Sequence, residues 1–85
     1  MKPVTIYSTR VCPYCLRAKA LLQSKQIAYT EYLVDMDGAR RTEMLRKSGG
    51  RRTVPQNFIG EQHVGGCDEL YALDRQGQLD RLLAD

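Results

Sequence analysis

The sequence has no tryptophan, a single phenylalanine and a single histidine, and only three cysteines among 85 residues. It contains no run approaching the about 18 apolar residues that a membrane-spanning helix needs, and its first residues lack the features of a signal peptide. Three cysteines are too few for the several disulfides that hold small secreted proteins together. These absences exclude a secreted disulfide scaffold, and we expect a cytoplasmic protein without membrane association.

The sequence also lacks a strong excess of charge of one sign. It has 13 lysines and arginines and 10 acidic residues, which give a net charge of +3. This excess is far below that of a dedicated nucleic-acid-binding protein, and we expect no nucleic-acid partner. Apolar residues at 42% and charged residues at 27% are typical of a globular domain. The length is that of one domain, so we predict a single domain over residues 1–85.

The first half of the chain predicts a strand, a helix and a second strand. The β-branched and aromatic residues of Val4–Ser8 indicate a strand, and a helix follows as far as about Lys25. A strand at 29–33 completes a parallel, right-handed βαβ unit. Apolar spacings of four, three and four residues predict the buried face of the helix, which comprises Val11, Cys15, Ala18 and Leu22, with Leu21 beside them.

A second helix is predicted over 39–47, with Asp35 or Asp37 as its N-cap and Gly49-Gly50 at its end. Short strands at 57–59 and 63–64 form a hairpin that turns at Gly60.

A third helix begins around 65–67 and is broken by Gly77, and acidic residues in its first turn and Arg75 in its last suit the helix dipole. Leu79, Leu82 and Leu83 indicate a short C-terminal helix. The order β-α-β-α-β-β-α, with that last short helix, predicts an α/β domain with one mixed four-stranded sheet flanked by helices.

The motif Cys12-Pro13-Tyr14-Cys15 lies where the first strand passes into the first helix. A thiol at a helix start meets unpaired N–H groups and the positive end of the dipole, which lower its pKa from the usual value of about 8.5. Arg10 and Arg17 add positive potential. We therefore predict that Cys12 is the nucleophile and that Cys15, on the apolar face, resolves a mixed disulfide formed on Cys12.

A zinc site is an alternative interpretation, with Cys12, Cys15, His63 and Cys67 as its four ligands. His63 and Cys67 lack the spacing of a structural zinc site, and Pro13 suits the first turn of a helix. We therefore predict no metal site. His63 is interpreted as a strand residue of the hairpin, and Cys67 as a small packed residue at a helix start.

Three blocks of sequence resemble one known family: Cys12-Pro13-Tyr14-Cys15, Thr53-Val54-Pro55-Gln56 and Gly65-Gly66-Cys67-Asp68. They occur in the order found in glutaredoxins of the short bacterial dithiol type, and the resemblance covers nearly the whole chain. The Pro-Tyr pair between the cysteines distinguishes the motif from that of thioredoxin, which carries Gly-Pro. The resemblance implies a thioredoxin-like fold.

The resemblance also implies a glutathione site that includes a cis peptide before Pro55. Thr53 and Val54 correspond to the backbone contacts with the cysteine of glutathione, and Tyr14 to the aromatic residue that lines the groove. The residues corresponding to the site for the γ-glutamyl end are Gly66, Cys67 and Asp68.

One position departs from the family pattern, because Thr9 stands where the family usually has a lysine that meets the glycine carboxylate of glutathione. Arg10 follows Thr9 and is one candidate for that contact. Arg51 and Arg52 are the others, and they belong to a segment that is one residue longer than usual. The sequence leaves the choice among the three arginines open.

The activity implied by the resemblance is glutathione-dependent reduction of protein disulfides and glutathione mixed disulfides, within cell redox homeostasis and electron transport. No tightly bound cofactor is implied, and an NADPH-linked reductase restores glutathione. We expect a monomer whose partners are glutathione and disulfide-containing or glutathionylated proteins. The alternatives are a carrier of a [2Fe–2S] cluster between two subunits, which Pro13 argues against, and glutathione-independent reduction of one dedicated partner.

Overall fold

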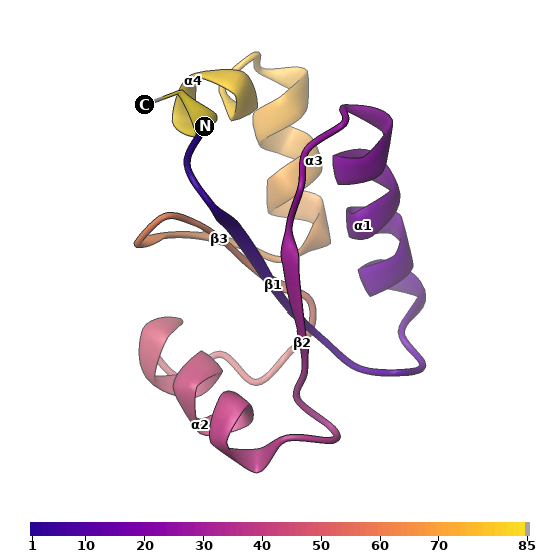
Figure 1. Cartoon of the computed structure of the whole chain (residues 1–85), viewed down its shortest axis with the longest axis vertical. Helices are drawn as coiled ribbons and strands as arrows, with labels where there is room; N and C mark the ends of the chain where they lie inside the picture. The colour runs from indigo at the N-terminus through magenta and orange to yellow at the C-terminus, as the bar shows by residue number, and fades with distance from the viewer. Residues whose placement is uncertain (85) are drawn as a thin grey trace.

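The structure is a computed structural model, and it describes residues 1–84. Its elements are β1 (Val4–Ser8), α1 (Pro13–Ser24), β2 (Thr30–Leu33), α2 (Gly38–Lys47), β3 (Gln56–Ile59), β4 (Gln62–Gly65), α3 (Cys67–Arg75) and α4 (Leu79–Leu83). The strands form one sheet in the order β2-β1-β3-β4, in which β1 and β2 are parallel and the other pairs antiparallel. The predicted element order and the mixed sheet of a thioredoxin-like fold are confirmed (Figure 1).

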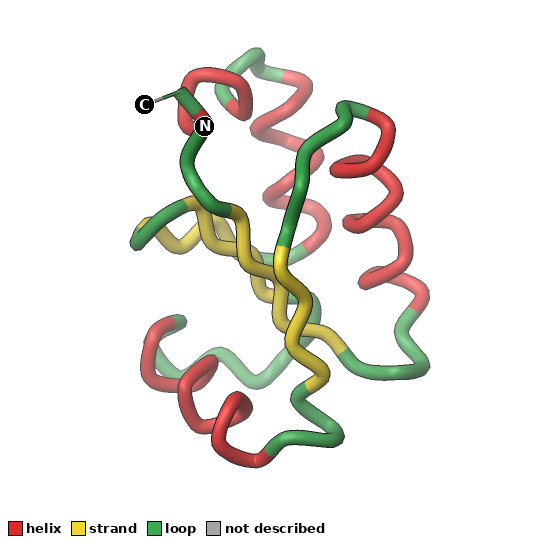
Figure 2. The backbone as a smooth tube through the Cα atoms, viewed as in Figure 1, coloured by secondary structure: helices red, strands yellow, loops and turns green. Residues whose placement is uncertain are grey.

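Helices cover both faces of the sheet, with α1 and α3 on one face and α2 on the other (Figures 1 and 2). Successive strand residues point to opposite faces, so Ile6 and Tyr7 of β1 enter different clusters. The cluster on the α1–α3 face comprises Val4, Ile6, Ala18, Leu21, Leu22, Ile27, Ile59, Cys67, Leu70, Leu79 and Leu83. The cluster on the α2 face comprises Tyr7, Val34, Met44 and Phe58.

The first helix begins at the dithiol motif. Cys12 is the N-cap of α1 and Pro13 occupies the first turn, where its missing N–H leaves no hydrogen bond unmade. The prediction that Val11 is part of the buried face is wrong, because its side chain is 90% exposed. Val11 precedes the N-cap, so helical periodicity does not place it. The buried face of α1 consists of Cys15, Ala18, Leu21 and Leu22.

Asp37 is the N-cap of α2, and its carboxylate accepts a hydrogen bond from the Arg40 N–H at 3.2 Å. The alternative cap, Asp35, forms an ion pair with Arg10 instead. The helix ends at the predicted glycines, where the Gly50 N–H donates to the Leu45 carbonyl at 2.7 Å. Both ends of α2 therefore follow from local capping chemistry.

The first residues of the chain lie beside α4, away from the dithiol motif (Figure 1). The Lys2 N–H donates to the Leu83 carbonyl at 2.8 Å, which joins the segment before β1 to α4. The longest helix within residues 1–84 is α1, with 12 residues, and none there is long and apolar enough to cross a membrane.

Candidate active site

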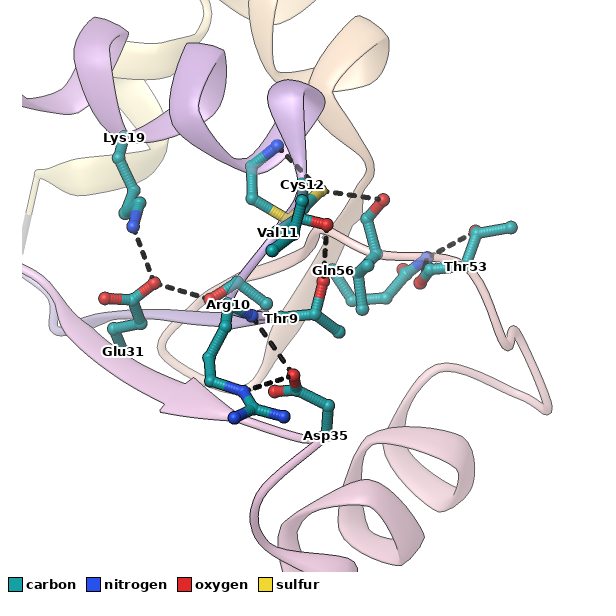
Figure 3. Close-up of a disulfide and its surroundings, with 12 residues drawn as sticks. Thr9, Arg10, Val11, Cys12, Lys19, Glu31, Asp35, Thr53 and Gln56 are labelled. Carbon is teal, nitrogen blue, oxygen red and sulfur yellow. Dashed lines mark hydrogen bonds and ion pairs between the residues drawn. A yellow bond between two sulfur atoms is a disulfide. The ribbon is translucent and has the colours of Figure 1, made fainter.

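Cys12 and Cys15 form a disulfide across the first turn of α1, with their Cα atoms 5.2 Å apart (Figure 3). The Cys15 N–H donates a hydrogen bond to the Cys12 sulfur at 3.0 Å. Cys12 is partly exposed, whereas Cys15 is 1% exposed. Only Cys12 is therefore open to an approaching substrate, and the N–H directed at its sulfur stabilises negative charge there once the pair is reduced.

A cleft lies beside Cys12, whose sulfur is 3.9 Å from the carbonyl oxygen of Val54. Three segments form it: the start of α1, the loop before β3 and the start of α3. Its lining comprises Tyr14, Arg51, Thr53, Val54, Pro55, Gly66, Cys67, Asp68 and Glu69. Of the nine residues predicted to bind glutathione, seven line this cleft, and Arg10 and Arg52 do not.

The loop before β3 presents backbone to the cleft. The peptide bond between Val54 and Pro55 is cis. Within residues 1–84, the Val54 N–H has no hydrogen-bond partner. The Gln56 side chain holds Thr53 in place, because its amide nitrogen donates to the Thr53 carbonyl at 3.0 Å and to the Thr53 hydroxyl at 3.2 Å. A free N–H beside a thiol is the group that an extended peptide would pair with.

At the start of α3, the N–H groups of Cys67 and Asp68 have no partner within the helix, because they belong to its first turn. The Glu69 carboxylate accepts the Gly66 N–H at 2.6 Å. Gly65 has a φ of +114°, and a Cβ there would lie 2.6 Å from that carboxylate, so only glycine fits. Glu69 thus holds the residue that precedes the first turn of α3.

Glu69 is a cleft residue that we did not predict from the sequence. Its carboxylate also lies 3.4 Å from the guanidinium of Arg51, another residue of the lining. The Gly66 N–H and the charge of Arg51 hold the pKa of Glu69 below its usual value. The signal in the sequence was the three-residue spacing between Gly66 and Glu69, at which a glutamate in the first turn of a helix can accept the N–H of the cap residue.

Arg51 is the one candidate arginine that lines the cleft. Arg10 is occupied elsewhere, because its Nε lies 2.9 Å from the Asp35 carboxylate and its backbone N–H donates to the same oxygen (Figure 3). The hydrogen bond from the Arg10 side chain lowers the pKa of Asp35. Arg52 is exposed and lies outside the lining.

The third cysteine, Cys67, is 4% exposed and packs in the cluster on the α1–α3 face. Burial raises the pKa of its thiol, and the charge of Arg17 opposes this rise only in part. Cys67 therefore contributes a buried side chain to the wall of the cleft. This confirms that it is a small packed residue at a helix start.

Tyr14 forms the outer wall of the cleft, with 55% of its surface exposed. The Arg17 guanidinium lies 5.9 Å from the centre of its ring and 5.8 Å from that of Tyr71. The Tyr71 hydroxyl also donates to the Arg17 carbonyl at 3.0 Å. Arg17 thus links the dithiol helix to α3 next to the cleft.

The four residues of the zinc alternative do not come together. Cys12 and Cys15 are bonded to each other, and His63 pairs with Gln56 at 2.6 Å. In the part of the chain that the structure describes, no three or more histidine, cysteine or acidic side chains are placed to hold a metal ion.

A redox-active pair with one accessible sulfur, located at a helix start beside a cleft with free peptide groups, defines a thiol–disulfide oxidoreductase. The glutaredoxin family model matches residues 4–64. Glutaredoxin 3 of Escherichia coli is 57% identical over 83 residues, which cover 98% of this chain and 99% of the relative. The chain therefore belongs to the glutaredoxin family, whose members are glutathione-dependent thiol–disulfide oxidoreductases.

Solved structures agree with this assignment. The solution structure of the glutaredoxin from Brucella melitensis is 52% identical with a TM-score of 0.83, covering 98% of this chain and 89% of that one. The crystal structure of the buckwheat glutaredoxin–glutathione complex is 34% identical with a TM-score of 0.86. The match covers 96% of this chain and 76% of that one.

Proposed function

We propose that this protein uses glutathione to reduce protein disulfides and, as deglutathionylation, the mixed disulfides between glutathione and protein thiols. The observation that carries the proposal is the partly exposed Cys12 sulfur at the edge of a cleft that presents a free Val54 N–H. The glutathione complex of the buckwheat relative, whose fold is the same, supports glutathione as the ligand.

Glutathione is a tripeptide with two carboxylates and one ammonium group, and the cleft offers a complement to each part. Val54 and Thr53 pair with the backbone of its cysteine, next to Cys12. The first-turn N–H groups of Cys67 and Asp68 bind the γ-glutamyl carboxylate, and the Asp68 side chain binds the ammonium group. Gly66 leaves room for this end of the ligand, and Tyr14 and Pro55 line the groove.

The glycine carboxylate of glutathione is assigned to Arg51. Its position in the lining supports this choice, and so does the long contact of its guanidinium with Glu69 at 3.4 Å, which an incoming carboxylate can replace. Arg10 and Arg52 remain the alternative candidates for the contact with the glycine carboxylate. Arg10 would first have to leave Asp35, which it binds through both its side chain and its backbone.

With a mixed disulfide as substrate, the Cys12 thiolate attacks the glutathione sulfur, and the protein leaves as a thiolate that takes up a proton. A second glutathione thiolate then attacks the glutathione sulfur of the intermediate, which releases oxidised glutathione and restores the Cys12 thiolate. With a protein disulfide, Cys15 attacks the mixed disulfide on Cys12, and the substrate leaves fully reduced. Two glutathione molecules then reduce the Cys12–Cys15 disulfide.

The remaining parts of the proposal concern the setting. The protein works as a monomeric single domain in the cytoplasm, where an NADPH-linked reductase keeps glutathione reduced, and it contributes to electron transport and cell redox homeostasis. It needs no tightly bound cofactor, and its partners are glutathione and oxidised or glutathionylated proteins. A reducing compartment suits this role, because the Cys12–Cys15 pair must be returned to the dithiol after each turnover.

The experiment measures the reduction of a mixed disulfide between glutathione and a small thiol, coupled to the reduction of oxidised glutathione. Cys12→Ser removes the nucleophile and should lower kcat roughly a thousand-fold or more. Cys15→Ser is the matched control on the same helix, and it should keep part of this activity while it loses the reduction of protein disulfides.

Full activity of the Cys12→Ser variant would refute the mechanism. Turnover of a protein disulfide that does not change when glutathione is withheld would favour a dedicated thioredoxin-like reductase. A brown purified protein with visible absorbance would favour the carrier of an iron–sulfur cluster.

A further inference from the structure

A chain of side chains on the α2 face joins β4 to the loop that forms the cleft. The His63 Nε2 lies 2.6 Å from the Gln56 Oε1. The Gln56 Nε2 donates to the carbonyl of Thr53 at 3.0 Å and to its hydroxyl at 3.2 Å. Gln56 is 0% exposed, so no solvent replaces a lost partner of its amide. A buried amide therefore connects a histidine of the hairpin to the residue next to Val54.

The direction of each hydrogen bond follows from the chemistry of the groups. A carbonyl oxygen only accepts, so the Gln56 amide must turn its NH₂ toward Thr53. The Oε1 of Gln56 then faces His63 and needs a donor, which requires the hydrogen of the imidazole on Nε2. Both this neutral tautomer and the imidazolium carry that hydrogen, so the bond to Gln56 survives protonation of the ring.

Packing seats the His63 ring independently of this bond. The ring lies on Phe58, with centroids 4.9 Å apart, and Phe58 in turn meets Tyr7 edge-on at 5.6 Å. Burial, together with the charge of Arg51, lowers the pKa of His63. A phenylalanine at position 63 would therefore keep the aromatic packing and would lose only the donor.

We propose that His63 is a positioning residue for glutathione binding, because it orients the Gln56 amide that holds Thr53 and the adjacent Val54 peptide at the cleft. The inference rests on the proposed function, in which these two residues pair with the ligand. Without the Nε2–H, the Gln56 Oε1 is buried without a partner, and the amide must rotate or shift to find one. Thr53 then loses its support.

This role has a kinetic signature. Within residues 1–84, His63 interacts with Gln56 and Phe58 and has no contact with Cys12 or Cys15. A loss of its donor should therefore weaken the binding of the glutathionyl group and leave the chemistry at Cys12 unchanged. The Michaelis constant, KM, rises and kcat stays the same, whereas a merely structural defect lowers the fraction of active protein and hence kcat.

The test compares His63→Phe with His63→Gln in the reduction of a mixed disulfide of glutathione and a small thiol. For His63→Phe we expect KM to rise about five-fold, the equivalent of one lost hydrogen bond, with kcat within about two-fold of the wild type. His63→Gln should restore most of the affinity, because its amide nitrogen reaches about as far as Nε2 and also donates.

Gln56→Met removes the link itself, and a double-mutant cycle completes the test. Gln56→Met should raise KM at least as much as His63→Phe, and the double variant should raise it no further, because both substitutions break the same chain. If His63→Phe does not fold, KM and kcat are measured on Gln56→Met, in which the His63 ring stays in place.

Two outcomes would overturn the inference: an unchanged KM in folded His63→Phe, or a His63→Gln variant as impaired as His63→Phe. Additive effects in the cycle would do the same. Failure of the proposed function is separately visible, because the wild type itself would then not turn over the glutathione mixed disulfide, and the inference would fall with it.

Discussion

The two faces of the sheet differ in size and in chemistry. The α1–α3 face holds a cluster of 11 buried residues, all apolar, whereas the cluster on the α2 face has four. Hydrogen bonds supplement packing on the α2 face, where the hydroxyl of buried Tyr7 donates to Glu43 and the Gln56 amide joins His63 to Thr53. The candidate site draws on both faces, since its cysteines lie at the start of α1 and the loop that contains Thr53 and Val54 precedes β3.

The difference shows how one small domain divides two tasks. The proposed mechanism uses Cys15 as a resolving cysteine that is hidden from solvent, and apolar packing of α1 buries Cys15 together with Ala18 and Leu22. To pair with glutathione as proposed, the loop at Thr53 needs backbone groups that are free and held in one orientation. Apolar packing alone does not orient such groups. Directional hydrogen bonds from the Gln56 side chain supply that orientation.

The largest expected effect tests how strongly apolar packing stabilises each face of the sheet. Leu22→Ala and Met44→Ala each shorten a side chain that is 0% exposed, on the α1–α3 face and the α2 face respectively. We expect Leu22→Ala to lower the free energy of unfolding by about 3–5 kcal/mol and Met44→Ala by about 2–3 kcal/mol. The smaller cost is expected because the cluster that contains Met44 is small and its neighbours Tyr32, Leu45 and Val54 are only partly buried. Urea unfolding gives both values.

Leu16→Ala is the matched control on α1, because Leu16 is 63% exposed and its loss leaves no cavity. A larger loss of stability for Met44→Ala than for Leu22→Ala would show that the smaller cluster is the more tightly packed one.

The next effect concerns two candidate arginines, Arg51 in the cleft lining and Arg10 outside it. Arg51→Ala should raise KM for a glutathione mixed disulfide about three- to ten-fold, because it removes the proposed charge-assisted contact with the glycine carboxylate. Arg10→Ala should change KM by less than about two-fold, since its side chain is bound to Asp35. Both effects should shrink as salt is added, because exposed charges are screened.

Arg46→Ala, which removes an exposed arginine of α2 outside the lining, controls for the overall loss of positive charge. A larger rise in KM for Arg10→Ala than for Arg51→Ala would reassign the contact with the glycine carboxylate to Arg10.

The smallest effect tests the polar network of the α2 face. The hydrogen bond from Tyr7 and the charge of Arg40 lower the pKa of Glu43 below its ordinary value of 4.5. Stability gained from this carboxylate is therefore present above that value and is lost as the pH falls through the folded pKa. Glu43→Gln should be less stable than wild type at neutral pH, and the gap should narrow between about pH 5 and pH 3.

Urea midpoints at several pH values measure this gap, and Glu61→Gln, at an exposed glutamate of the hairpin turn, provides the control. A gap that stays constant with pH would mean that ionised Glu43 contributes nothing to stability.

Local patterns predicted the helices and strands well. The Pro13 start of α1, the glycine-rich end of α2 and the dipole-matched charges of α3 all appear where capping chemistry placed them. The failure at Val11 has the same origin, because helical spacing was extended across the N-cap into a residue that is not helical. Choosing Asp37 over Asp35 needed the ion pair with Arg10, a contact across 25 residues.

The sequence by itself determined the reactive pair, its position at a helix start and the order of the elements, because these depend on neighbours within one helical turn. Only the tertiary structure decided that Arg51 lines the cleft while Arg10 does not, that Glu69 of α3 meets Arg51 and that His63 reaches Thr53 through Gln56. Those contacts arise when the sheet brings separate loops together, and no local propensity encodes which long side chain finds which partner.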